Sequence, residues 1–313
     1  MARAFIFPGQ GAQTIGMGRA LAEAYPAAQA VFDEVDAALG ENLSGLIWEG
    51  DIETLTLTQN AQPALMATSM AAMRALESEG VTIAAASFVA GHSLGEYSAL
   101  TAAGALALAD SARLLRLRGQ AMQAAVPVGV GAMAALLGLD LATAREVAAE
   151  AAQGEICEAA NDNDPAQVVI SGHKAAVERA LDIAKARGAK RALLLPVSAP
   201  FHCALMAPAA EAMAAALAEV TISTPDVPLV ANVLAAPVST PEQIRELLVQ
   251  QVTGSVRWRE SVEVMAAEGV AEFWEIGAGK ALSGMVKRIR RDSLQRSIGT
   301  PDEVRAAAAA LAG

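Results

Sequence analysis

The 313-residue sequence has few of the residues that build metal sites, disulfide frameworks or aromatic binding surfaces. Its two cysteines, Cys157 and Cys203, have no metal-ligand spacing and give no disulfide framework. Aromatic residues make up 4% of the chain, and only three histidines are present. The composition therefore predicts no metal and no bound redox cofactor, and it leaves few side chains that could act as a general base.

Long apolar runs and excess positive charge are also missing. The longest uncharged stretches, 54–73, 119–139 and 192–210, are interrupted by proline, glycine or amide side chains, so none is typical of a membrane-spanning helix. The apolar run after Arg3 is too short for a signal peptide. A net charge of −11 argues against general nucleic-acid binding. We expect a soluble, cytoplasmic protein that binds neither membrane nor nucleic acid.

The apolar content of 54% is sufficient for a sizeable core. Strand-like and helical patterns follow the order β-α-β-β-α-β over residues 131–138, 141–152, 156–160, 167–171, 174–187 and 190–197. This order is the ferredoxin-like pattern. Strands predicted at 3–7, 84–90, 229–232 and 271–276 alternate with helical segments on either side of it. We predict a larger α/β domain, residues 1–128 and 197–313, with a small ferredoxin-like domain, residues 129–196, inserted into it.

The segment Gly91-His92-Ser93-Leu94-Gly95 matches G-x-S-x-G. It lies between an apolar strand and a helical pattern, where a sharp turn would lift the Ser93 hydroxyl out of the sheet. This context favours a nucleophile. The alternative, a capping serine in a glycine turn, stays open because short motifs also occur by chance.

A serine hydroxyl is a weak nucleophile unless a base lies beside it. His202 is the best candidate because it follows Pro200, just beyond the last strand of the inserted segment. His92 shares the tight turn of the serine, so we expect its ring to point elsewhere, and His173 is expected to be an exposed structural residue. Taken alone, His202 would more often be a buried structural histidine.

Arg118 falls on the apolar face of a helix predicted over 110–125, together with Leu114 and Leu117. A buried arginine is costly unless it is paired, and its planar fork fits a carboxylate in a bidentate way. The open alternatives are an internal Asp or Glu partner, or an outward orientation. Arg113 and Arg116 fall off this face and are predicted to be solvated.

Six segments occur in one order between residues 3 and about 291: 7–13 (FPGQGAQ), 91–97 (GHSLGEY), 116–119 (RLRG), Asn161, 196–202 (PVSAPFH) and 251–258. Together they resemble the malonyl-CoA:acyl-carrier-protein transacylases of bacterial fatty-acid synthesis. The resemblance implies an α/β-hydrolase-like large domain with the inserted ferredoxin-like domain. It also implies that coenzyme A enters as a thioester substrate and not as a cofactor.

The resemblance also implies roles in catalysis. Ser93 attacks the malonyl thioester, and His202 takes the serine proton while the backbone carbonyl of Gln251 orients its ring. The N–H groups of Gln10 and Leu94 form the oxyanion hole.

Further implied roles concern the substrate. Arg118 holds the malonyl carboxylate, and Asn161 and His92 support the site across the domain cleft. Phe201, just before the histidine, excludes α-branched donors, and Met122 is the alternative selectivity residue.

Charged residues near these segments give two more expectations. Asp162 and Asp164 depart from the uncharged residues of many relatives, and we expect both to point to solvent, because a carboxylate in the cleft would repel malonate. The acyl-carrier protein partner is acidic, so it needs a local basic patch on this acidic chain. The candidates are the pair Lys190 and Arg191 and the pair Lys287 and Arg288.

Three other functions remain as alternatives. A discrete polyketide-type acyltransferase or an acyl hydrolase would use the same Ser-His site. A lipase or patatin-like hydrolase is disfavoured because the sequence has no His-Gly-Gly-Gly motif and no Asp-Gly pair. A non-catalytic scaffold that binds carrier protein is disfavoured by the presence of Ser93, His202 and Arg118.

Overall fold

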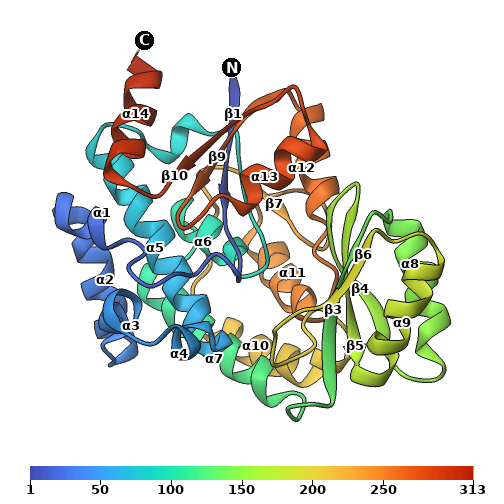
Figure 1. The fold of residues 1–313 in the computed structure, drawn as a ribbon. Helices are drawn as coiled ribbons and strands as arrows, with labels where there is room; N and C mark the ends of the chain where they lie inside the picture. The colour runs from blue at the N-terminus through green and yellow to red at the C-terminus, as the bar shows by residue number, and fades with distance from the viewer. Residues whose placement is uncertain (313) are drawn as a thin grey trace.

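The computed structural model describes residues 1–312, which form a mixed α/β structure with two separate β-sheets (Figure 1). The six-stranded sheet contains β1 (Ala2–Phe7), β2 (Phe88–Gly91), β7 (Leu229–Ala231), β8 (Ala236–Val238), β9 (Val270–Ile276) and β10 (Leu294–Ile298). The four-stranded sheet contains β3 (Gly131–Leu137), β4 (Cys157–Asp164), β5 (Gln167–His173) and β6 (Arg191–Leu194). The predicted α/β class is confirmed.

The larger sheet brings two loops of the chain together. Its strand order is β10-β9-β1-β2-β7-β8, and all neighbours are parallel except β7 and β8. At the ends of two central strands, Phe7 of β1 pairs with Gly91 of β2. Parallel strands place their carboxyl ends at the same edge of a sheet, which is where ligands bind in open α/β sheets. The loop after Phe7 and the turn after Gly91 therefore lie side by side at that edge.

Helices cover both faces of the larger sheet. The chain forms α1 (Arg19–Ala24), α2 (Pro26–Leu39), α3 (Leu43–Glu49), α4 (Ile52–Thr56), α5 (Thr58–Ser78), α6 (Gly95–Ala102), α7 (Leu108–Ala124), α8 (Leu141–Ala152), α9 (Lys174–Ala186), α10 (Ala207–Glu219), α11 (Pro241–Thr253), α12 (Trp258–Ala267), α13 (Ala281–Ile289) and α14 (Pro301–Ala312). Successive side chains of a strand point to opposite faces. Accordingly, Phe5 and Phe7 of β1 join the core that includes α5 and α7, whereas Ala4 and Ile6 pack with α12 and α13.

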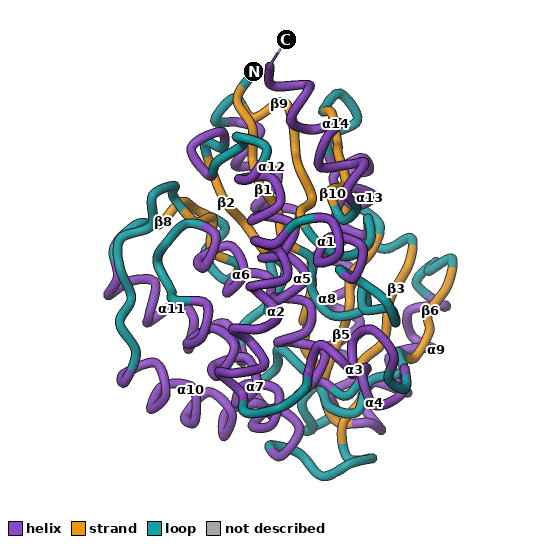
Figure 2. Tube along the Cα trace, turned by 90° about the vertical axis from the view of Figure 1, so that its left-hand side faces the viewer, coloured by secondary structure: helices purple, strands orange, loops and turns teal. Residues whose placement is uncertain are grey.

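The smaller sheet is antiparallel and lies, with α8 and α9, to one side of the larger sheet (Figures 1 and 2). On one face, Leu136 and Ile170 pack against Val147 of α8 and Val177 of α9. On the other face, Met133 belongs to the main core of the protein. The smaller sheet is thus apolar on both faces, and its second face packs into the main core.

Strand β4 is longer than the sequence predicted. The sequence predicted a strand that ends at residue 160, but β4 continues to Asp164 with two register irregularities. The N–H of Asp162 donates to the carbonyl of Val256 at 2.9 Å, and the N–H of Val256 donates to the carbonyl of Ala160 at 2.8 Å. This parallel pairing with a distant segment holds turn-forming residues in an extended conformation.

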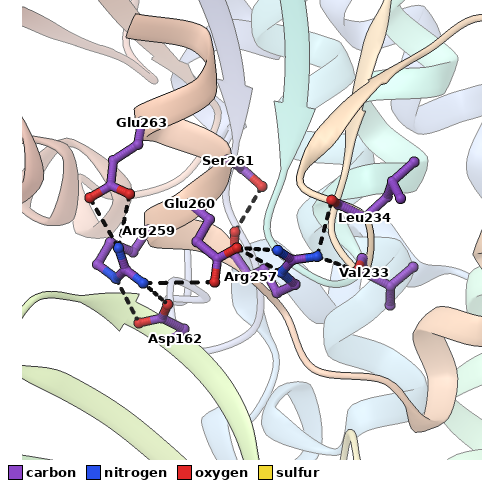
Figure 3. Close-up of polar contacts among 8 residues, drawn as sticks. All are labelled: Asp162, Val233, Leu234, Arg257, Arg259, Glu260, Ser261 and Glu263. Atoms are coloured by element: carbon purple, nitrogen blue, oxygen red, sulfur yellow. Dashed lines mark hydrogen bonds and ion pairs between the residues drawn. The ribbon is translucent and has the colours of Figure 1, made fainter. Parts of the chain in front are cut away.

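The expectation that Asp162 and Asp164 face solvent was wrong. Both side chains are almost fully buried, with 1% and 2% exposure. Asp162 forms an ion pair at 2.9 Å with Arg259 of α12, which also binds Glu263 (Figure 3). Asp164 forms one at 2.6 Å with Arg288 of α13. Ion pairing offsets the cost of burying each carboxylate, and both pairs join β4 to helices that pack on the larger sheet.

The expectation that Arg116 is solvated was also wrong. Arg116 is buried, its Nη1 donates to the carbonyl of Gln59 at 2.7 Å, and its Nη2 pairs with Glu41. Arg113 is exposed as expected and pairs with Asp110 at 3.1 Å. Arg116 lies off the apolar stripe of α7 but faces the start of α5, and the polar groups there stabilise it.

Strand β2 begins at Phe88 and not at residue 84, because a short 3-10 turn, η1 (Ile83–Ala85), occupies the first part of that apolar run. Among the described helices, none combines the length and the apolar character needed to cross a bilayer.

Candidate active site

Ser93 lies on a sharp turn between β2 and α6. Its φ of 54° is in the left-handed region, which is strained for a residue with a side chain. A Cβ atom on Gly91 would lie 1.9 Å from the backbone of Gly95, and one on Gly95 would lie 2.3 Å from the carbonyl oxygen of Phe7. The two glycines therefore permit the turn that raises Ser93 at the carboxyl edge of the sheet.

Two distant side chains hold the backbone of Ser93. Its N–H donates to Oδ1 of Asn232 at 2.8 Å, and its carbonyl accepts from Nε2 of Gln251 at 2.9 Å. Asn232 also donates to the carbonyl of Gly91 at 2.7 Å. The patterns in the sequence did not indicate Asn232. Its position directly after β7, which neighbours β2, is the signal that could have found it.

His202 lies within hydrogen-bond distance of the nucleophile. Its Nε2 is 2.7 Å from Oγ of Ser93, and its Nδ1 is 2.9 Å from the carbonyl oxygen of Gln251 and 3.1 Å from that of Gly254. Carbonyl oxygens only accept, so Nδ1 carries the proton and the Nε2 lone pair faces the serine. Burial, together with the charge of Arg118, lowers the pKa of His202 to about 3. The ring is therefore neutral near pH 7 and able to accept a proton.

The guanidinium of Arg118 also contacts Oγ of Ser93. Its Nη2 donates to Oγ of Ser93 at 3.1 Å and to Oε1 of Gln251 at 2.7 Å, while Nη1 donates to Oε1 of Gln62 at 2.8 Å. Among the ion pairs of residues 1–312, none involves Arg118, although the side chain is 1% exposed. The structure therefore gives Arg118 no internal carboxylate partner among the described residues, which answers the alternative left open by the sequence. A buried cation with only neutral partners is suited to bind an anionic ligand.

The site opens into a cavity of about 430 Å³. Nine of the ten residues singled out from the sequence line it: Gln10, His92, Ser93, Leu94, Arg118, Met122, Asn161, Phe201 and His202. The tenth, Gln251, reaches His202 and Arg118 from α11. Among the described residues, no group of three or more His, Cys, Asp or Glu side chains is arranged to hold a metal ion.

His92 connects the turn to the smaller sheet. Its Nε2 is 2.8 Å from Oδ1 of Asn163 on β4, so the ring points away from Ser93, as expected. Burial lowers the pKa of His92. Asn163, which the sequence analysis did not name, is the partner of His92, whereas Asn161 lies on the cavity wall.

Gln10 and Leu94 are on the loops after β1 and β2, which adjoin at the sheet edge. The side chain of Gln10 accepts from Thr58 at 3.0 Å, and Thr58 accepts from Gln62 at 2.9 Å. Because Gln62 also binds Arg118, a continuous chain of side chains joins the guanidinium to the loop after β1. Gln62, which the sequence patterns did not indicate, lines the cavity from α5.

Residues 4–301 match the family model of the acyl transferase domain. The malonyl CoA-acyl carrier protein transacylase of Escherichia coli (strain K12) is 48% identical over 304 residues, which are 97% of this chain and 98% of that protein. The solved acyl-carrier-protein-S-malonyltransferase of Bartonella henselae is 56% identical, with a TM-score of 0.98 and 100% of each chain covered. A malonyl-transacylase solved in complex with a type II polyketide synthase (PKS) acyl-carrier protein is 43% identical, with a TM-score of 0.96 and 99% and 100% covered. This chain therefore belongs to the acyl transferase family and, within it, to the malonyl-CoA:acyl-carrier-protein transacylases.

Proposed function

We propose that the chain moves a malonyl group from coenzyme A to the phosphopantetheine thiol of acyl-carrier protein through an ester on Ser93. One observation carries the proposal: His202 Nε2 and Arg118 Nη2 converge on the same hydroxyl oxygen, at 2.7 Å and 3.1 Å. The histidine supplies a base for the nucleophile, and the guanidinium favours a donor that carries a carboxylate. The relatives that cover nearly the whole chain are named for this reaction.

The first half-reaction forms the malonyl ester. Neutral His202 accepts the Ser93 proton as Oγ bonds to the thioester carbonyl carbon. The oxyanion that develops is held by the N–H groups of Gln10 and Leu94. This assignment is supported by their place on the cavity wall, and within residues 1–312 neither N–H donates to another protein group. The C–S bond then breaks, and His202 returns its proton to the coenzyme A sulfur.

The second half-reaction runs the same steps in reverse. The carrier-protein thiol gives its proton to His202 as its sulfur attacks the ester carbonyl. The Ser93–acyl bond breaks, and the proton returns to Oγ. No cofactor takes part in either half-reaction of this scheme, and coenzyme A leaves before the carrier protein reacts. The exchange is therefore ping-pong.

Donor selection depends on three side chains of the cavity wall, Arg118, Phe201 and Met122. The malonyl carboxylate lies against Arg118, one methylene away from the reacting carbonyl. Phe201 and Met122 are both nearly buried and limit the width of the cavity near the α-carbon of the donor. Asn161 contributes a polar group from β4 across the cavity.

We also propose the domain division predicted from the sequence: residues 1–128 and 197–313 as an α/β-hydrolase-like catalytic domain, and 129–196 as a ferredoxin-like domain. In support, the two sheets share no strand, and β3 to β6 fall between residues 131 and 194. The order β4-β5-β3-β6 with α8 and α9 on one face agrees with a β-α-β-β-α-β unit. The expected cytoplasmic location stays a prediction.

The carrier protein is proposed to dock on a basic rim beside the cavity. Lys190 and Arg191 stand at the start of β6, an edge strand whose continuation lines the cavity at Leu195. At the second candidate patch, Arg288 is paired with Asp164, so part of its charge is already neutralised. Lys287 forms no ion pair among the described residues. Lys190 and Arg191 also form no ion pair among the described residues, so the first patch offers the larger uncompensated positive charge.

A discrete polyketide-type acyltransferase is the second candidate function. The observation that favours it is the likeness to a malonyl-transacylase solved with a type II polyketide carrier protein. The carrier protein, and not the acyl site, would distinguish the two pathways.

A transfer assay tests the proposal against the hydrolase alternative. The protein is incubated with malonyl-CoA and holo acyl-carrier protein, and malonyl-carrier protein and free malonate are both quantified. The proposal predicts that malonyl-carrier protein is the main product. Malonate as the main product would show that the chain is an acyl hydrolase.

A further inference from the structure

A buried carboxylate that the proposed mechanism does not use lies behind the nucleophile. Glu96 is in the first turn of α6, three residues after Ser93, and is 1% exposed. Its Oε2 accepts from Nε2 of Gln251 at 2.6 Å and more weakly from the N–H of Asn232 at 3.4 Å. It does not line the cavity, and it forms no ion pair among the described residues. Burying a carboxylate costs free energy unless hydrogen bonds or an ion pair compensate for the lost hydration.

The short contact of Glu96 fixes the orientation of an amide. On one side, Nε2 of Gln251 faces the Glu96 carboxylate and the Ser93 carbonyl; on the other, Oε1 accepts from Arg118 at 2.7 Å. A carboxylate or carbonyl only accepts, and a guanidinium only donates. Only one orientation of the Gln251 amide lets its nitrogen donate to Glu96 and Ser93 while its oxygen accepts from Arg118. Of the two acceptors, Glu96 lies closer to the nitrogen.

Glu96 contacts both of the residues that hold the backbone of Ser93. Ser93 has the strained φ of 54°, and its carbonyl and N–H are bound by Gln251 and Asn232. Both of these side chains belong to residues that contact Glu96. Burial raises the pKa of Glu96 to about 7, against the hydrogen bond from Gln251 and the charge of Arg118. The carboxylate therefore occupies an unfavourable position next to the two residues that clamp the nucleophile.

We propose that Glu96 is a positioning residue: its carboxylate oxygen fixes the Gln251 side-chain amide and thereby places both the Arg118 guanidinium and the Ser93 backbone for malonyl transfer. The proposal rests on the function proposed above, and it assigns to Glu96 no contact with substrate. Its essential property is the reach of an acceptor oxygen to Gln251. The negative charge is secondary.

Two conservative variants separate reach from charge. Glu96→Asp keeps the charge but withdraws the carboxylate by one methylene, whereas Glu96→Gln keeps an acceptor oxygen at full reach and removes the charge. We expect Glu96→Asp to lower kcat/KM for malonyl-CoA by about 100-fold, the scale of a 1 Å misplacement. Its KM for malonyl-CoA rises, and its preference for malonyl over acetyl donors falls by about tenfold, as for one lost hydrogen bond to a charged group. Glu96→Gln retains at least about a tenth of the wild-type kcat/KM.

A second buried glutamate provides the matched control. Glu275 accepts from the N–H groups of Leu282 and Ser283 at the start of α13, which is a structural role. Glu275→Asp should lower the thermal midpoint and leave the malonyl-to-acetyl preference unchanged.

The outcomes separate this inference from the proposed function. The wild-type rate tests malonyl transfer, and the ratios of variant to wild type test Glu96. Equal loss with both donors at unchanged KM in Glu96→Asp would overturn the positioning role, as would a Glu96→Gln variant that is less active than Glu96→Asp. If Glu96→Asp does not fold, Glu96→Gln must still fold and retain about a tenth of the wild-type activity, or the inference is wrong.

Discussion

The Arg118 guanidinium and the Ser93 hydroxyl are in direct contact, with Nη2 3.1 Å from Oγ. In a malonyl thioester, one methylene separates the carboxylate from the carbonyl that the serine attacks. A guanidinium beside the nucleophile can therefore hold the carboxylate while the carbonyl stays in reach of Oγ. The contact connects donor recognition to the chemical step at a single position.

Replacement of Arg118 by alanine should change the class of donor. The malonyl carboxylate would be left unpaired in a buried site, a loss of about 2–5 kcal/mol in malonyl transfer. Acetyl transfer should be kept or increased, because acetyl has no carboxylate. The measurement is kcat/KM for malonyl-CoA and acetyl-CoA, with Arg113→Ala, an exposed arginine of the same helix, as the control. Equal loss with both donors would show that Arg118 is structural.

Replacement of Phe201 by serine should admit a branched donor. Phe201 is 9% exposed and lines the cavity directly before His202. Room for one methyl group in an apolar pocket corresponds to about 1–3 kcal/mol. A competition assay should therefore show a higher ratio of methylmalonyl to malonyl transfer in Phe201→Ser than in the wild type. An unchanged ratio would assign the selectivity to another wall residue, with Met122 as the next to test.

The protonation state of His202 gives a prediction for NMR. Its folded-state pKa of about 3 lies below the value of about 6.5 for an unfolded chain. Between these values the unfolded chain binds the proton and the folded chain does not, so stability from this group is present above pH 6.5 and is lost as the pH falls. Imidazole ¹⁵N shifts, assigned with a His202→Gln variant, should show a neutral ring with the proton on Nδ1 at pH 5.5. A ring that titrates near pH 6.5 would contradict this.

Charge reversal at the basic rim should separate the two half-reactions. Lys190→Glu with Arg191→Glu should slow transfer to carrier protein and leave acylation of Ser93 by malonyl-CoA largely intact, since steering acts on the protein partner. The carrier-protein step should also slow as salt rises. Lys287→Glu tests the second patch, and Arg305→Glu on α14, far from β6 in Figure 1, is the control. If neither reversal changes the rate of transfer to carrier protein, or if salt has no effect on that rate, the carrier protein docks elsewhere.

Local patterns in the sequence predicted the parts of the fold and site that depend on neighbouring residues. The helix expected over 141–152 is α8, because an Asp140 cap and a regular apolar spacing specify it locally. The turn at Ser93 was predictable for the same reason, since the glycines on either side are the residues that such a turn requires.

Contacts between distant segments were not predictable from one sequence. The hydrogen bond from Ser93 to Asn232 spans 139 positions, and the one from Gln251 to Glu96 spans 155. Asp162 was expected in solvent because a carboxylate in the cleft would repel malonate, and no residue near it in the sequence indicates its partner Arg259. Turn-rich residues became part of β4 because Val256 supplies hydrogen bonds there. These features require the arrangement of both sheets.

Covalent labelling of Ser93 is the most direct test of an acyl-serine intermediate. The protein is incubated with malonyl-CoA in the absence of carrier protein, and the mass of each proteolytic peptide is measured. The proposed mechanism predicts one added malonyl group on the peptide that contains Ser93, and none in Ser93→Ala. A label on another residue, for instance Cys203, or a label that persists in Ser93→Ala, would contradict the proposed mechanism.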